Sequence, residues 1–473
     1  MTGVMLADKN EIIEAPPLAD GTVYSKRRKH QPFSVPPIER YTALVGEERT
    51  QRLLSVAERL KGLKLLEVNA TATGGGVAEM LYSFIPFLND LGIAAEWKVI
   101  RGTPQYFEVT KTMHNQLQGM RGQFTPEMKR IYFETLESNV KDDNFDYEPS
   151  VVMIHDPQPL GLVNYIKEKR QSWLWRCHID ISETVIEDNH NLWNLVADCL
   201  GRYDAAFFSA AQYVKEKWPV PKFIIPPFID PLSEKNRQLT KEEINKVLAR
   251  YNIDPSVPLI VQIGRFDPWK GIGRTIATFR RVRRMKKCQL IIAGGMASDD
   301  PEGEQMLAKF LEDTKNDEDI HILNLPLEPR LVNYHEVNAL QRAASVIMQP
   351  STREGFGLVV TEALWKGKPV IAADVGAISL QIKDGSNGYF YQNTYQAEMK
   401  VLRLLTDHDL AQKIGQRGHA YVIEHFLMQD RVADYLKSIE LTLDSNNHRK
   451  LSPDIVVSFR SWYKLGKKRN SKV

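Results

Sequence analysis

Two glutamates and a glycine turn form the stretch with the clearest chemical potential. Glu354 stands directly before Gly355-Phe356-Gly357, and Glu362 follows eight positions after the first glutamate. On one helix the two carboxylates would lie about 12 Å apart along the axis, beyond the roughly 5 to 9.5 Å of a hydrolytic acid pair. We therefore expect two separate tasks for these carboxylates rather than one shared proton.

The residues after this turn predict an anion site. Residues 358–366 have the pattern of an apolar helix, which Gly367-Lys368-Pro369 ends before an apolar strand at 370–373. A turn that opens directly into a helix presents free backbone N–H groups, here near Leu358 and Val359, at the positive end of the helix dipole. An anion is expected at this end of the helix.

A second glycine turn follows the apolar strand 63–68, with the sequence GGGVAE from Gly74 to Glu79. A dinucleotide fingerprint requires another glycine three places after the second one, and this chain has alanine and glutamate there instead. NAD binding is therefore disfavoured. Gly75 and Gly76 still allow backbone amides to approach a charged oxygen closely, which suits a phosphate or sugar cleft; a turn that only reverses the chain is the alternative.

Two cations follow the strand predicted at 258–263. The guanidinium of Arg265 can clamp two phosphate oxygens, and the ammonium of Lys270 supplies a point charge five positions later. Together they could stabilise a departing diphosphate, although single surface cations often have no such task.

Histidines end two apolar strands of the first half. His155 precedes Asp156, and His178 lies in the string WRCHID between Arg176 and Asp180. Open parallel sheets keep their sites at the carboxyl ends of strands, so these polar side chains are candidates for a binding site. A structural hydrogen bond is the alternative for either histidine.

Other conspicuous residues predict structure instead of chemistry. Trp173 and Trp175 share one face of a strand, so core packing is favoured over stacking on a sugar. The acidic groups Asp142-Asp143 and Asp317-Glu318-Asp319 lie in polar loops, and we predict that they are solvated. No metal site is expected.

Size and composition indicate a two-domain enzyme. The chain has 473 residues, 43% of them hydrophobic and 26% charged, and a net charge of only +3, which argues against a protein built to bind nucleic acid. Its three scattered cysteines predict no disulfide frame and fit a reducing cytoplasm. The first residues have no secretory pattern, and no apolar run is long enough to span a membrane.

Strands alternate with helices in both halves, which predicts two parallel sheets covered by helices. The prolines of residues 226–231 interrupt this alternation and indicate a linker. We predict a loose arm at 1–39, one Rossmann-like domain at 40–228, a second at 229–425, and a final segment at 426–473 with a helix and a basic tail (Lys464–Lys472).

These motifs resemble the retaining glycosyltransferases of the GT-B fold, family four. The resemblance rests on Glu354, the Gly-Phe-Gly turn, Glu362 and the string GKPV at 367–370. It implies an α/β fold of two doubly wound domains facing across a cleft, with a C-terminal helix that returns to the first domain.

The resemblance also implies roles for the residues. Glu354, His178, Arg265 and Lys270 would be catalytic. The donor would contact the first glycine turn and the second turn with its helix, and the ribose would meet Glu362, whereas the acceptor would lie near Glu79, Arg176 and Asp180. The donor set is Gly75, Gly76, Gly355, Phe356, Gly357, Leu358, Val359 and Glu362.

Longer strings, among them HDPQP at 155–159 and RFDPWKG at 265–271, resemble the trehalose glycosyltransferring synthases and the trehalose phosphorylases. The resemblance implies transfer of glucose from UDP-glucose or ADP-glucose to free glucose, with retention and no other cofactor, in the cytoplasm. A phosphorylase that uses inorganic phosphate is the alternative, and a non-catalytic sugar or nucleotide sensor is a third. The expected partners are small sugars, without nucleic acid or integral membrane contact, and a homodimer is compatible with this picture.

Overall fold

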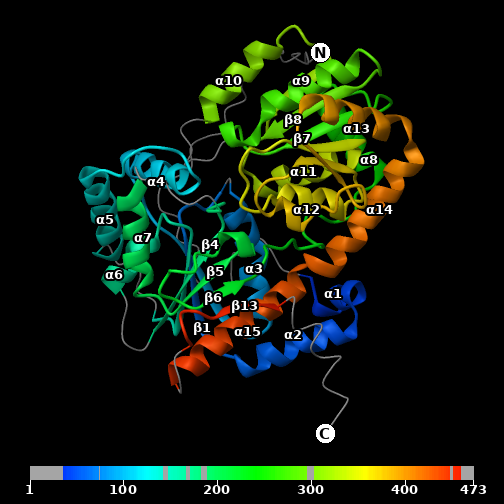
Figure 1. Cartoon of the computed structure of the whole chain (residues 1–473). Coiled ribbons are helices and arrows are strands. Elements are labelled where there is room, and N and C mark those ends of the chain that lie inside the picture. Colours follow the sequence, from blue (N-terminus) through cyan, green and yellow to red (C-terminus); the bar gives the residue numbers. More distant parts are fainter. Residues whose placement is uncertain are drawn as a thin grey trace, which may run out of the picture.

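The structure is a computed structural model that describes residues 36–73, 75–141, 148–166, 171–182, 189–295, 303–447 and 451–459. Most of the predicted arm, Gly74, the pair Asp142-Asp143 and the basic tail lie outside these residues. Within them the chain forms two lobes, each built on one sheet (Figure 1).

The first lobe contains a seven-stranded parallel sheet in the order β13-β6-β5-β4-β3-β1-β2. Parallel pairing requires a crossover after each strand, and helices provide these crossovers on both faces. The strands are β1 (Lys64–Asn69), β2 (Ala94–Val99), β3 (Val151–His155), β4 (Ser172–Cys177), β5 (Ala205–Phe208), β6 (Lys222–Ile224) and β13 (Val456–Ser458).

Residues that alternate along these strands separate the two faces of the sheet. Leu65, Met153 and Phe207 pack with one group of helices, whereas Val68, Trp173 and Trp175 face a second group. Core packing of both tryptophans is thus confirmed. The first group is α2 (Glu47–Arg59), α3 (Gly76–Asp90) and α15 (Met428–Asn447), and the second is α4 (Pro104–Leu117), α5 (Pro126–Lys141) and α7 (His190–Leu200).

The second lobe contains a six-stranded parallel sheet in the order β12-β11-β10-β7-β8-β9. Its strands are β7 (Leu259–Ile263), β8 (Gln289–Gly294), β9 (Ile320–Asn324), β10 (Val346–Gln349), β11 (Val370–Ala373) and β12 (Tyr389–Tyr391). One face is covered by α8 (Lys241–Arg250), α11 (Arg330–Ala343) and α12 (Leu358–Trp365), and the other by α9 (Ile272–Arg283), α10 (Gly303–Thr314) and α13 (Thr394–Thr406).

The predicted architecture of two Rossmann-like sheets is confirmed, with three local differences. Helix α1 (Ile38–Val45) begins before the predicted end of the arm. The short strands β12 and β13 were not predicted, because three residues are too few to show a period. Asp317 and Asp319 are not simply solvated, since Arg280 and Arg283 form ion pairs with them.

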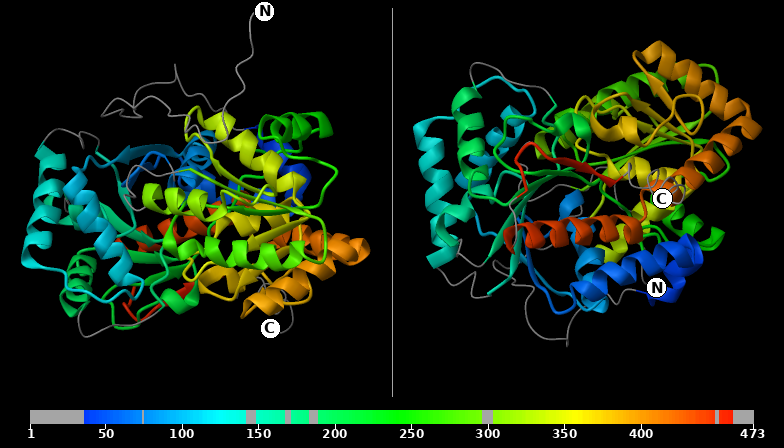
Figure 2. Two further views of the ribbon diagram at one scale, coloured as in Figure 1. Left: turned by 90° about the horizontal axis from the view of Figure 1, so that it is seen from above. Right: turned by 60° about the horizontal axis from the view of Figure 1, so that its bottom comes forward.

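The chain passes between the lobes at two neighbouring points. The backbone N–H of Ile229 donates to the carbonyl of Phe426 at 3.0 Å, and that of Met428 donates to the carbonyl of Ile229 at 3.1 Å. After the second crossing, which follows α14 (His408–His425), α15 runs beside α2 on the first lobe (Figure 2). The predicted return of the C-terminal helix is therefore confirmed. Among the described helices, none combines the length and the apolar character needed to cross a membrane.

The returning helix contributes a large part of the first lobe's core. Ile439 of α15 is fully buried beside Leu436 and Tyr435, so shortening it should leave a cavity. We expect Ile439→Ala to lower the free energy of unfolding by about 2 to 5 kcal/mol, as measured by urea denaturation. Met285→Ala, at a side chain that is 72% exposed, is the control and should change it little. An Ile439→Ala protein as stable as the wild type would contradict this packing.

Candidate functional site

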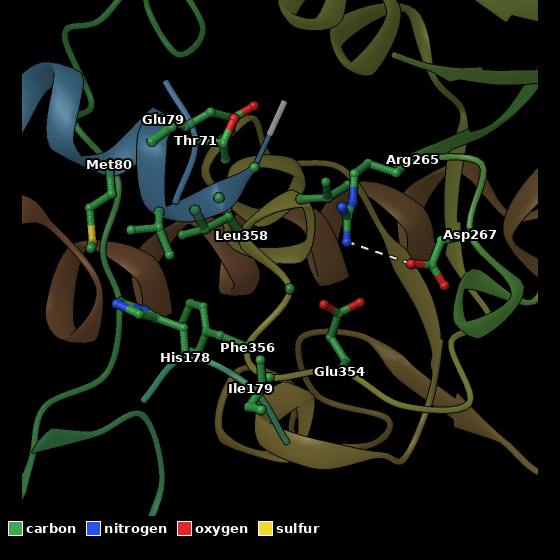
Figure 3. A pocket seen from close by; sticks show the side chains of 18 of the residues that line it. Thr71, Glu79, Met80, His178, Ile179, Arg265, Asp267, Glu354, Phe356 and Leu358 are labelled. Carbon is green, nitrogen blue, oxygen red and sulfur yellow. Dashed lines mark ion pairs between the residues drawn. The ribbon is translucent and has the colours of Figure 1, made fainter. Parts of the chain in front are cut away.

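A cavity of about 320 Å³ lies where the carboxyl ends of both sheets meet. The first lobe contributes the turn before α3, the residues after β3 and β4, and one side of α4. The second lobe contributes the residues after β7 and the turn before α12 (Figure 3). The predicted residues that line it are Gly75, Gly76, Glu79, His178, Arg265, Lys270, Glu354, Gly355, Phe356, Gly357, Leu358 and Val359.

The carboxylate of Glu354, a residue that is 9% exposed, accepts several hydrogen bonds. Its Oε2 atom accepts hydrogen bonds from Lys270 Nζ at 2.6 Å, Ser351 Oγ at 3.0 Å and Gln349 Nε2 at 3.1 Å. Three donors on one oxygen lower the reactivity of this carboxylate as a nucleophile and fix its direction. This arrangement suits a residue that positions a ligand.

The turn after Glu354 is possible only with glycines. Gly357 has φ of 80°, in the left-handed region, and begins α12 without a side-chain cap. A Cβ atom on Gly355 would lie 1.8 Å from the carbonyl oxygen of His178 in the other lobe. The amides at the start of α12 therefore border the cavity beside a close approach of the two lobes, where they can bind an anion.

The first glycine turn lies directly opposite. Gly75 precedes α3 without a side-chain cap, and a Cβ atom on Gly76 would lie 3.4 Å from the side chain of Leu358. Two helix N-termini, one from each lobe, thus border the same cavity. Their dipoles both favour a negatively charged ligand.

Cations gather at one side of the cavity. Arg265 lies 3.5 Å from Asp267 (Figure 3). Asp267 also pairs with Lys111 of α4 at 3.4 Å. Burial and the cations Lys111 and Arg265 lower the pKa of the neighbouring His114 to about 3. The cations on this side of the cavity, together with the two helix N-termini, favour an anionic ligand.

Residues of α4 were missed by the sequence analysis, yet they line the cavity. Lys111, His114 and Gln118 follow one another at intervals of three and four residues, so they share one side of the helix. This polar stripe was the available signal. Lys235, which was also missed, lines the cavity from the segment after the first crossing.

Three predicted residues do not line the cavity. Glu362 is buried in α12, where Lys235 lies 3.1 Å from Oε1 and Gln341 donates to Oε2 at 3.1 Å. Arg176 is buried beneath the sheet, with its guanidinium 5.8 Å from the ring of Tyr435. Asp180 is buried and accepts a hydrogen bond from Ser182. The structure thus places these three behind the wall of the cavity.

Among the described residues, no group of three or more histidine, cysteine, aspartate or glutamate side chains is arranged to hold a metal ion. The free thiols of Cys177, Cys199 and Cys288 are all buried.

Lowering the pH should destabilise the protein through His114. Its pKa of about 3 in the folded state lies below the ordinary value of 6.5, so the unfolded chain binds a proton first as the pH falls. The contribution to stability is complete above pH 6.5 and is lost toward pH 3. We expect the free energy of unfolding to fall less between pH 7.5 and pH 5 in His114→Gln than in the wild type. The exposed His408→Gln is the control, and equal slopes in all three proteins would contradict the prediction.

The sequence matches two protein-family models, one in each lobe. Residues 67–215 match the family model described as trehalose synthase, N-terminal domain, and residues 243–421 match glycosyl transferases group 1. The chain is 43% identical over 407 residues to a trehalose synthase of Thermococcus litoralis, covering 84% of this chain and 95% of that protein. It is 29% identical over 411 residues to a trehalose phosphorylase of Pleurotus sajor-caju, covering 74% of this chain and 54% of that protein.

Solved structures agree on the fold. The α,α-trehalose 6-phosphate synthase from Burkholderia multivorans superposes with a TM-score of 0.62 at 15% identity, covering 81% of this chain and all of that chain. A structure of Anabaena HepE in complex with UDP-glucose superposes with a TM-score of 0.57 at 14% identity, over the same shares of the two chains. The two lobes thus have the GT-B fold, as the sequence predicted.

Proposed function

This chain belongs to the trehalose synthase family of glycosyltransferases, and we propose that it transfers glucose from a nucleoside diphosphate glucose to free glucose with retention, giving trehalose. The observation that carries the proposal is the cavity in which Glu354, Lys270, Arg265 and two helix N-termini converge. The crystallised relative in complex with UDP-glucose supports a donor of this kind. The three buried thiols are free, which fits a reducing compartment, and we propose the cytoplasm.

In the proposed reaction the diphosphate lies against Arg265, Lys270 and the amides that begin α12. Negative charge grows on the diphosphate as the bond to the sugar breaks, and these groups stabilise it in place. Glu354 holds the sugar, with His178 on the opposite wall. Because Oε2 of Glu354 already accepts three hydrogen bonds, we assign it no covalent intermediate.

The acceptor enters from the first lobe, where Glu79 and the polar side of α4 line the cavity. An oxygen of the leaving diphosphate takes the proton of the attacking hydroxyl, on the face from which it departs. This single-face route accounts for retention. Arg176 and Asp180 do not line the cavity, so in this scheme they do not contact the acceptor.

One assay tests the reaction. Purified protein is incubated with glucose and UDP-glucose, ADP-glucose or glucose 1-phosphate, and the disaccharide formed is identified. We expect trehalose from a nucleotide sugar, and Glu354→Ala should reduce turnover by about 100-fold or more, since it removes the group that positions the sugar. Glu304→Ala, at an exposed residue of α10, is the matched control. A fully active Glu354→Ala protein would remove this residue from the site, and binding without turnover would indicate a sensor.

A trehalose phosphorylase is the second candidate, and one observation favours it. Glu362, the residue expected to hold the ribose, does not line the cavity and is occupied by Lys235 and Gln341. Inorganic phosphate needs no ribose site and could use the same cations. Trehalose and inorganic phosphate formed from glucose 1-phosphate and glucose, without a nucleotide sugar, would support this candidate.

Glu362 separates the two candidates. If the donor carries a ribose, Glu362→Ala should raise the KM for the nucleotide sugar by about tenfold or more, through the lost hydrogen bonds to a charged group. Glu79→Ala removes the other carboxylate that pairs with Lys235, at 2.7 Å, and should instead raise the KM for glucose. A Glu362→Ala protein with an unchanged KM for the nucleotide sugar would leave that carboxylate a purely structural role.

A further inference from the structure

A buried chain of hydrogen bonds leads from the core of the first lobe to the wall of the cavity. Oε2 of Glu67, in β1, lies 2.6 Å from Nε2 of His155, at the end of β3. Nδ1 of His155 lies 2.9 Å from Nε2 of His178, which follows β4. The exposed fractions of Glu67 and His155 are 0% and 1%, whereas His178 lines the cavity. Neighbouring parallel strands thus connect the sugar site to a carboxylate that solvent does not reach.

The second oxygen of Glu67 is also satisfied. The hydroxyl of Tyr435, in the returning helix α15, donates a hydrogen bond to Oε1. The guanidinium of Arg176, buried on the same face of the sheet, lies 5.8 Å from the centre of the Tyr435 ring. A carboxylate so deep in the core is costly unless it is paired, and here both oxygens and a nearby positive charge meet this need.

The order of donors along the chain follows from the chemistry of its first member. A carboxylate only accepts hydrogen bonds, so Nε2 of His155 carries a hydrogen. With that single hydrogen on its ring, His155 accepts at Nδ1 from Nε2 of His178. Burial, together with the nearby Arg176, lowers the pKa of His178 well below its ordinary value, so the His178 ring is neutral. Its Nδ1 atom is left as an acceptor, to which none of the described residues donates.

The position of the His178 ring is fixed as well. The two imidazoles are nearly parallel, with their centres 5.1 Å apart and their planes 18° apart, as expected for rings joined edge to edge by a hydrogen bond. The backbone N–H of His178 donates to Oδ1 of Asp156 at 2.7 Å. A histidine held by its backbone and by one ring nitrogen has little freedom to rotate.

We propose that Glu67, His155 and Tyr435 are positioning residues, which hold His178 in the tautomer with its hydrogen on Nε2 and so offer Nδ1 as an acceptor to a sugar hydroxyl. The identity of that ligand rests on the proposed function, whereas the tautomer does not. The hydrogen bond made by one ring nitrogen decides what the other can do. Because Tyr435 belongs to α15, the docking of the returning helix contributes to the order of the site.

Nitrogen-15 NMR of histidine-labelled protein tests the tautomer without any substrate. The signals of His178 are assigned by their loss in His178→Gln. In the wild type we expect a hydrogen on Nε2 and none on Nδ1. In Glu67→Gln the new amide can donate to His155, which reverses the chain, so a population of His178 with its hydrogen on Nδ1 should appear. His178 in one unchanged tautomer in both proteins, or a wild type with the hydrogen on Nδ1, would overturn the proposal.

Kinetics supply the second readout. We expect kcat of Glu67→Gln to fall by about 10- to 100-fold with little change in the KM for the donor, as is usual when the partner of a functional histidine is lost. Tyr435→Phe should lower kcat less, since it removes one of two bonds to Glu67.

Tyr203→Phe is the matched control, because Tyr203 is a buried tyrosine of the same lobe whose hydroxyl donates to the carbonyl of Leu160 at 2.6 Å. It should change neither the tautomer nor kcat. An equal loss of kcat in this control would overturn the specific role of the chain. A wild type that forms no trehalose would remove the proposed function and leave the NMR result standing.

Discussion

The approach of Gly355 to the carbonyl oxygen of His178 determines the shape of the site. This contact between backbones leaves no room for a side chain, so it sets how near the two lobes come. The hydroxyl of Tyr213, from the first lobe, donates to the carbonyls of Glu354 and Gly355 at 3.0 Å and holds the turn in place. The turn before α12 is thereby fixed against the opposite strand ends, and Glu354, which directly precedes the turn, is held with it.

The closeness of the lobes gives the charges their strength. Glu354 and Lys270 pair where both side chains are mostly buried, and two helix N-termini add partial positive charge from both sides. Charges that would be weak on an open surface are strong in such a place, and they need no rearrangement when negative charge develops on a ligand. The proposed transfer therefore requires few further catalytic groups from the protein.

The two crossings of the chain connect the site to distant parts of the sequence. Ile229 pairs with the backbone at Phe426 and Met428, so both passages between the lobes lie side by side. Helix α15 then places Tyr435 beneath the first sheet, where it meets Glu67. The helix that follows the second crossing thus belongs to the core of the first lobe.

The sequence by itself determined the longer strands, the main helices, the two Rossmann-like sheets and the two glycine turns with their neighbouring charges. Those features depend on local spacing: alternation along a strand, an apolar period along a helix, and glycines where the backbone must turn sharply or pass closely. The family resemblance added the GT-B arrangement and the expected roles of Glu354, Lys270 and His178.

Only the tertiary structure decided which of these residues share one cavity. It brought in Lys111, His114 and Lys235, placed Arg176, Asp180 and Glu362 behind the wall, and joined Glu67 to Tyr435 across 368 positions of the chain. Contacts between residues so far apart in the sequence depend on strand register and on the angle at which the lobes pack. Both are set by many contacts at once, so no spacing within a short stretch of sequence can reveal them.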